Sequence, residues 1–247
     1  MTTPILEIRG LTVSFGGLRA VDDVSFEVSR NRITTVIGPN GAGKSTLFNL
    51  ISGALQPRNG KVLIEGVDYT GQPPYRMQAA GLARSFQITN LFFDLPVSEN
   101  LRLAAQVLEP LWMAWRPIRA SRAALARVDE LLDRFGLADK AQYPAGSLSH
   151  GEQRRLEVAV AVACKPKILL LDEPTQGMSH GDSQQTATLI KSLATDVTVV
   201  LIEHDIGLVM SLSDHVIVMH QGQKLAEGLP ADVRSNPAVQ AAYFGHA

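Results

Sequence analysis

The glycine-rich stretch at residues 38–46 carries residue types that can bind a chain of phosphate groups. It reads GPNGAGKST and fits the pattern G-x-x-x-x-G-K-[ST]. In this pattern the backbone N–H groups of the loop surround a polyphosphate, the lysine reaches the outer phosphates and the serine hydroxyl can hold Mg²⁺. The pattern therefore predicts a nucleotide site built from Gly38, Pro39, Asn40, Gly41, Ala42, Gly43, Lys44, Ser45 and Thr46.

Candidate catalytic residues also follow two apolar runs further along the chain. Asp172 and Glu173 come directly after residues 168–171, and His204 lies just beyond residues 198–202. The carboxyl ends of parallel strands meet at the ligand crevice of an α/β sheet. We expect Asp172 to bind Mg²⁺ through water, Glu173 to polarise the attacking water and His204 to contact the γ-phosphate or that water. The alternatives are an acidic turn for the pair and a structural hydrogen-bonding role for the histidine.

The sequence LSHGEQ at residues 148–153 precedes a long helical pattern. Ser149 and Glu152 have the S-x-x-E spacing of a capping box, which predicts a well-capped helix. A second interpretation is an anion site, because an exposed helix N-terminus beside the small Gly151 offers free N–H groups. Taken alone, the spacing favours the capped helix.

The phosphate-binding loop requires a strand before it and a helix after it. Residues 33–37 are β-branched and apolar, as in a buried strand of a parallel sheet, and residues 46–51 supply the helix, which we expect to end near Gly53. Residues 168–171 and 198–202 are further buried strands, separated by a helix at 183–193.

The rest of the chain alternates between β-rich and helical character. In the segment 97–135, Leu125, Val128, Leu132 and Phe135 share one helix face, with Gly136 as the expected C-cap. Residues 230–243 are expected to form a short helix with a tail, capped by Asp232 or Asn236. Short strands are expected in the first third, at 5–8, 11–15, 24–28, 33–37 and 61–64.

Composition limits the classes of protein to which the chain can belong. Its 247 residues allow one large domain or two small ones, and the net charge of −1 gives no electrostatic reason to expect nucleic acid as a partner. The single cysteine excludes a disulfide framework. No apolar stretch approaches the ~18 residues of a membrane span, and the N-terminus lacks a signal-peptide pattern. We therefore expect a soluble cytoplasmic chain that reaches a membrane only through a partner.

The ordered set GPNGAGKST, LSHGEQRRLEVAVA, ILLLDEPT and LIEHD resembles the ATP-binding subunit of an ABC transporter along essentially the whole chain. The resemblance implies an α/β fold: a P-loop NTPase (RecA-like) core with an N-terminal antiparallel β part and an inserted helical subdomain. The bounds that we expect are 1–87 and 164–229 for the core, 88–163 for the helical subdomain and 230–247 for a tail.

The resemblance also implies roles for residues whose chemistry the spacing does not reveal. The signature motif of the family corresponds to Ser149, His150, Gly151 and Glu152, of which Ser149 and Gly151 would contact the γ-phosphate bound to the opposite subunit. Gln87 matches the glutamine that reaches Mg²⁺ and links the core to the helical insert. Phe15 corresponds to the aromatic that stacks on adenine, with Val21 alongside; the alternative is a phenylalanine in the core of a strand.

More narrowly, ARSFQITNLF, HGEQRRLEVA, LIEHDIGLVM and NPAVQAAYFG resemble the ATPases of branched-chain and hydrophobic amino-acid importers. This implies an ATP- and Mg²⁺-dependent ATPase that energises a membrane permease at the cytoplasmic face. Its expected partners are permease subunits, a second ATPase subunit in a homodimer or heterodimer and, indirectly, a periplasmic solute-binding protein. The alternatives are a lipid or lipopolysaccharide exporter and a soluble ABC ATPase. The 62-residue interval from Gln87 to Ser149 has no room for the long coiled coils of DNA-acting members.

Three positions, two in the signature and one in the loop after the acidic pair, depart from the pattern of the family. His150 stands where the signature commonly has glycine, and Glu152 replaces a common glutamine. We expect function to survive, because a helix N-terminus offers backbone N–H groups whatever the side chain at position 150. Ser179 stands where an aspartate is often found, which bears on communication between subunits more than on hydrolysis.

Two further segments have a functional and a structural interpretation. The apolar residues 88–96, which include Leu91, Phe92 and Phe93, predict a docking surface for the permease; the alternative is packing of the helical insert. Trp112, Trp115 and the arginines after them could contact a partner or lipid headgroups. The interpretation that we favour for this second segment is a loop that packs its aromatics, with Arg116, Arg119, Arg122 and Arg127 on a solvated helix face.

Overall fold

The computed structural model describes residues 3–85, 91–109 and 121–244. By its internal contacts the chain divides into two compact units. Unit 1 consists of Met1–Arg84, Lys167–Glu173 and Ile190–Ala247, and unit 2 of Ser85–Pro166 and Pro174–Leu189. Unit 2 thus includes residues that we expected in the core, and the domain bounds given above stay a prediction.

A four-stranded antiparallel sheet forms the N-terminal part of unit 1, in the order β2-β1-β4-β5. The pairing of β1 with β2 runs from Leu6 opposite Val28 to Phe15 opposite Leu18, with irregularities between. Polar and apolar residues alternate along these strands, so one face packs on the core. The strands are β1 (Leu6–Phe15), β2 (Leu18–Val28), β4 (Asn59–Ile64) and β5 (Val67–Asp68).

The second sheet of unit 1 has six strands in the order β10-β9-β3-β8-β7-β6. All neighbours are parallel except β10, which runs antiparallel to β9. Every residue of β3, β7 and β8 is buried, which fits strands made mostly of apolar and β-branched residues. The strands are β3 (Ile33–Ile37), β6 (Leu82–Arg84), β7 (Ile168–Asp172), β8 (Thr198–Ile202), β9 (His215–His220) and β10 (Gln223–Gly228).

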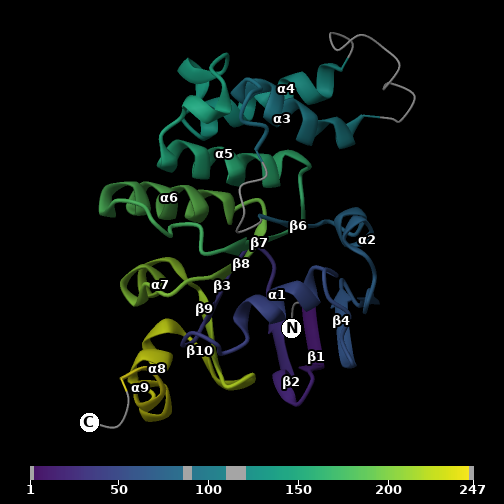
Figure 1. The fold of residues 1–247 in the computed structure, drawn as a ribbon, viewed down its shortest axis with the longest axis vertical. Helices are drawn as coiled ribbons and strands as arrows, with labels where there is room; N and C mark the ends of the chain where they lie inside the picture. Colours follow the sequence, from purple (N-terminus) through teal and green to yellow (C-terminus); the bar gives the residue numbers. More distant parts are fainter. Residues whose placement is uncertain (1–2, 86–90, 110–120, 245–247) are drawn as a thin grey trace. The chain divides into compact units, whose positions relative to one another are not determined.

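Helix α1 (Lys44–Ile51) lies in a large apolar cluster of unit 1, together with residues from both sheets. A smaller cluster covers the other side of β9 and packs under α7 (Ile206–Leu212), α8 (Pro230–Ser235) and α9 (Pro237–Phe244). Along β9, Ile217 and Met219 belong to the first cluster and Val216 and Val218 to the second. The sheet is therefore covered on both faces, as the expected α/β class requires. Figure 1 shows α8 and α9 beside each other near the C-terminus.

Unit 2 is helical in its described part. Helices α3 (Val97–Ala105), α4 (Arg122–Arg134) and α5 (His150–Ala163) pack on one another (Figure 1). The face predicted for α4 is largely confirmed, because Val128, Leu132 and Phe135 are buried. The C-cap is Phe135 rather than the expected Gly136, which follows it with φ 62°. The remaining elements are the short α2 (Pro74–Ala79) in unit 1, the 3₁₀ turns η1 (Gln106–Leu108), η4 (Ala138–Lys140) and η5 (Ala145–Ser147), and α6 (His180–Leu193), whose last four residues belong to unit 1.

The C-terminal residues form two helices rather than the single one that we expected. The break falls at Asn236, whose Oδ1 accepts hydrogen bonds from the N–H groups of Ala238 and Val239 at 2.9 and 3.4 Å. One of the two expected caps, Asn236, is therefore confirmed. No helix in the described residues has the length and apolar character needed to cross a membrane.

Candidate nucleotide site

The glycine-rich loop connects β3 to α1 and packs closely against neighbouring backbone. Gly41 and Gly43 have φ of 78° and 97°, in the left-handed region that favours glycine. A Cβ on Gly43 would lie 2.2 Å from the carbonyl oxygen of Ala20, so no other residue fits there without movement. The Gly222 N–H donates to the Ala42 carbonyl at 3.1 Å, which anchors the loop to the β9–β10 turn.

Lys44 is the first residue of α1, and only 7% of its surface is exposed. Its Nζ donates hydrogen bonds to the carbonyl oxygens of Gly38 and Pro39 at 2.7 and 3.1 Å. Burial lowers the pKa of the ammonium, while the Glu173 and Asp172 carboxylates raise it. The loop therefore holds a cationic group at its centre, where a polyphosphate would find both the charge and the N–H groups at the start of α1.

Asp172 ends β7, and its side chain is 2% exposed. Its Oδ2 accepts a hydrogen bond from the Nη2 of Arg84 at 3.1 Å. Arg84 in turn donates to Asn49 Oδ1 at 2.7 Å and to Ser52 Oγ at 3.0 Å. Asn49 lies in the C-terminal half of α1, and Ser52 is the C-cap of that helix. This buried guanidinium, which we did not expect, fixes the acidic strand end to the helix that follows the phosphate-binding loop. The sequence signal that could have revealed this contact is Arg84 itself, a charged residue at the end of the short apolar run that forms β6.

Glu173 follows with a backbone φ of 48°, uncommon for a residue other than glycine. Its N–H donates to the Ile202 carbonyl at 3.0 Å, which ties it to the end of β8. Its side chain is 17% exposed and approaches His204, with 3.8 Å between Glu173 Oε1 and His204 Nδ1. The two candidate catalytic side chains from neighbouring strands are thus brought together, and the His204 ring is 55% exposed.

Two oxygen-bearing side chains of unit 1, those of Asp172 and Ser45, suit an Mg²⁺ ion that is bound together with a nucleotide. Mg²⁺ prefers oxygen ligands and commonly takes one or two carboxylates, with phosphates and waters completing its shell. Asp172 supplies a carboxylate in unit 1, and Ser45, exposed in the first turn of α1, supplies a hydroxyl. The described residues contain no group of three or more His, Cys, Asp and Glu that could hold a metal. The donor set therefore suits an ion that arrives with phosphate oxygens.

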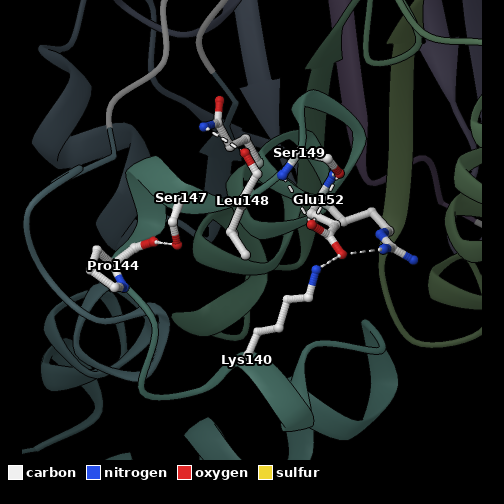
Figure 2. A network of polar contacts seen from close by, with 8 residues as sticks. Lys140, Pro144, Ser147, Leu148, Ser149 and Glu152 are labelled. Carbon is white, nitrogen blue, oxygen red and sulfur yellow. Dashed lines mark hydrogen bonds and ion pairs between the residues drawn. The ribbon is translucent and has the colours of Figure 1, made fainter.

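The signature stretch forms the N-terminus of α5, and the capping box is confirmed. Ser149 Oγ accepts from the Glu152 N–H at 3.4 Å, and the Glu152 carboxylate accepts from the Ser149 N–H at 3.0 Å. Figure 2 shows this carboxylate facing Lys140 as well. A Cβ on Gly151 would lie 3.2 Å from Asp182 Cγ, so this position is crowded within unit 2.

Three other predicted site residues differ in how the structure places them. Phe15, at the end of β1, is 52% exposed, which excludes the interpretation as a core phenylalanine and leaves its ring open to a stacking partner. Val21 is fully buried, so the expectation that it lies alongside the base is wrong. Gln87 lies outside the described residues.

Of the apolar segment 88–96, the structure describes residues from Leu91 onwards. Leu91 is 7% exposed and packs in unit 2, whereas Phe92 and Phe93 are 58% and 44% exposed. Packing therefore accounts for the leucine and leaves two aromatic rings at the surface. Trp112, Trp115, Arg116 and Arg119 lie outside the described residues.

Arg127 contradicts the expectation of a solvated arginine face. It is 9% exposed, pairs with Glu130 at 2.6 Å and donates to the Val162 carbonyl at 2.7 Å. Arg127 therefore joins α4 to α5, while Arg122 is exposed as expected.

Comparison with known proteins identifies the family. The ABC transporter family matches residues 21–176, and the branched-chain amino acid ATP-binding cassette transporter family matches residues 223–247. The high-affinity branched-chain amino acid transport ATP-binding protein BraF of Pseudomonas aeruginosa is 40% identical over 255 residues, covering 100% of both chains. LivG of Escherichia coli K12, which carries the same description, is 39% identical with the same coverage.

Solved structures agree with these sequence relatives. A nucleotide-free ATP-binding cassette from an ABC transporter superposes with a TM-score of 0.87 at 30% identity, covering 99% of this chain and 100% of the other. An ATP-binding cassette in its ADP conformation gives a TM-score of 0.86 at 31% identity, with the same coverage. The fold and the ordered motifs thus lead to one conclusion: the chain belongs to the ABC transporter family, as one of its ATP-binding, ATP-hydrolysing cassettes.

Proposed function

We propose that this cassette hydrolyses ATP to drive uptake of branched-chain or other hydrophobic amino acids, or related small organic solutes, through a membrane permease. The observation that carries the proposal is full-length identity of 39–40% to BraF and LivG. The match at residues 223–247 supports it independently, because that C-terminal segment lies outside the general ABC transporter match. Neither match favours lipid or lipopolysaccharide export.

In this proposal the loop at residues 38–46 binds the ATP phosphates, with Lys44 as the central cation. Catalysis of phosphoryl transfer depends on positioning and on electrostatic stabilisation of the phosphate oxygens, and the buried Lys44 ammonium is suited to both. Phe15 offers its exposed ring to the adenine. Ser45, Asp172 and Gln87 would hold Mg²⁺, which when bound neutralises charge on the phosphate oxygens.

Glu173 is proposed to accept a proton from the water that attacks the γ-phosphorus. The new P–O bond forms as the bond to the ADP oxygen breaks, and ADP leaves with the electron pair. His204, 3.8 Å from the Glu173 carboxylate, can hold this carboxylate or the γ-phosphate in place. The strained backbone at Glu173 and its bond to Ile202 fix the base at the end of the sheet.

A composite site between two ATPase subunits follows from the signature helix. Ser149, His150, Gly151 and Glu152 would meet the γ-phosphate bound by the partner in a homodimer or heterodimer. The permease would dock on the segment 88–96 through Phe92 and Phe93, at the cytoplasmic face of the membrane. A periplasmic binding protein would deliver the solute to the permease.

Reconstitution of the complete transporter in liposomes tests this proposal. We expect inward transport of radiolabelled leucine, isoleucine or valine that requires ATP with the cassette and is lost with Glu173→Gln. A polar solute such as maltose serves as the control and should not accumulate. ATP hydrolysis that no hydrophobic amino acid stimulates, with no uptake of these solutes, would contradict the proposed import function.

A further inference from the structure

The signature helix carries the negative charge of Glu152 at its N-terminus. In the proposed composite site, this end of the helix meets the negatively charged γ-phosphate. Ser149 Oγ lies 3.0 Å from Glu152 Oε2. A γ-phosphate oxygen at hydrogen-bond distance, about 3 Å, from the same hydroxyl would therefore lie within about 6 Å of the Glu152 carboxylate. Like charges at that distance repel, most strongly where water is excluded. The glutamine that is common at this position carries no such charge, so Glu152 requires compensation.

Lys140 provides that compensation from outside the signature motif. Its Nζ donates to Glu152 Oε1 at 2.5 Å, while the N–H and hydroxyl of Ser149 both donate to Oε2 at 3.0 Å (Figure 2). Arg155 contributes a weaker contact, 3.9 Å from Oε1. Lys140 therefore binds Oε1 of the Glu152 carboxylate, and Ser149 binds Oε2. The bond from Lys140 is also the main reason that the pKa of Glu152 lies below its usual range.

The backbone around Lys140 is anchored, so its ammonium is presented from a fixed position. The Lys140 carbonyl accepts from the Tyr143 N–H at 3.0 Å. The Ala141 and Tyr143 carbonyls accept from the first N–H groups of α3, those of Ser98 and Val97, at 2.9 and 3.0 Å. The Lys140 side chain is 42% exposed and that of Glu152 only 16%, so the carboxylate is the more confined partner.

The hydroxyl of Ser149 has one proton, which it donates to Glu152 in this structure. Donation to a phosphate oxygen requires the hydroxyl to rotate away from Glu152, which leaves the carboxylate with the Ser149 N–H and Lys140 as donors. We propose that Lys140, outside the signature motif, is a positioning residue for it: Lys140 neutralises Glu152 and holds it in place so that Ser149 can turn to the γ-phosphate of the opposite subunit. This inference rests on the proposed composite site.

Steady-state ATP hydrolysis by the assembled transporter in lipid nanodiscs tests the role of Lys140. Lys140→Met keeps the aliphatic stem and should lower kcat about fivefold, the upper range for a partly exposed pair, with KM for ATP changed less than about twofold. Lys140→Arg should recover most of the turnover, because it restores the charge. Lys165→Met, at an exposed lysine of the same unit, is the matched control and should behave as wild type.

A double-mutant cycle separates the charge from a structural effect of the side chain. Against the turnover of Glu152→Gln alone, adding Lys140→Met should cost less than about twofold, since the neutral amide needs no compensation. A fivefold loss in both backgrounds would overturn the proposal, as would Lys140→Met turnover equal to that of the Lys165→Met control. If Ser149→Ala leaves wild-type turnover unchanged, the composite site itself fails, which is a different result from failure of the Lys140 role.

Discussion

The buried ion pair between Arg84 and Asp172 gives the sharpest stability prediction. Arg84→Met keeps an aliphatic side chain and removes the guanidinium, whose carbon is 5.9 Å from the centroid of the Phe48 ring. The variant loses hydrogen bonds of 2.7, 3.0 and 3.1 Å to Asn49, Ser52 and Asp172. The Asp172 carboxylate, 2% exposed, then loses the positive charge beside it.

Removing one partner of a buried pair typically costs about 3–5 kcal/mol of unfolding free energy. For a chain of this size, that corresponds to a melting temperature lower by about 10 °C. Arg30→Met is the control, because Arg30 pairs with Glu65 at 2.5 Å but its side chain is 50% exposed. A surface pair of this kind contributes at most about 1 kcal/mol.

Thermal unfolding followed by circular dichroism measures the difference between the two variants. The double variant Arg84→Met, Asp172→Asn should recover part of the loss, because a neutral amide does not need the guanidinium charge. A melting temperature for Arg84→Met within about 2 °C of the Arg30→Met control would refute the assignment of this pair as a support of the acidic strand end.

Two other predictions concern docking and the C-terminal helix. Phe92→Ser, at a ring that is 58% exposed, should change the unfolding free energy by less than about 1 kcal/mol yet abolish solute-stimulated ATP hydrolysis in the assembled transporter; normal stimulation would place docking elsewhere. Burial raises the pKa of the Tyr243 phenol to about 12, so its neutral form stabilises the fold below pH 10, and this contribution is lost as pH rises from 10 to 12. Urea unfolding should therefore show a steeper loss of stability above pH 10 in the wild type than in Tyr243→Phe, and equal slopes would contradict this.

The sequence predicts those parts of the fold that local patterns determine. Residues 33–37, 168–171 and 198–202 are mostly apolar or β-branched because their strands are fully buried, and the structure confirms all three as strands. The capping box at Ser149 depends on residues three apart, and the N-terminus of α5 follows from it. Where side chains only a few positions apart decide the conformation, their spacing in the sequence is sufficient.

The missed features depend on contacts between distant parts of the chain. Arg84 meets Asp172 across 88 positions, which only the parallel pairing of β6 with β7 brings together. Strand β9 has an apolar pattern, but its role as the neighbour of β3 is set by sheet order. The contact between Lys140 and Glu152 spans a turn whose path depends on hydrogen bonds to α3. The positive φ of Glu173 likewise has no local signal.

Binding and turnover of ATP measured side by side test the central claim, that residues of unit 1 form a hydrolytic nucleotide site. We predict that Glu173→Gln binds ATP-Mg²⁺ in calorimetry with wild-type affinity and loses most turnover. Its unhydrolysed ATP should hold two subunits together on size-exclusion chromatography, after any requirement for a second type of ATPase subunit has been met. Lys44→Ala should lose ATP binding, because it removes the buried cation of the loop. Normal ATP affinity and turnover in Lys44→Ala, or undiminished turnover in Glu173→Gln, would contradict the account.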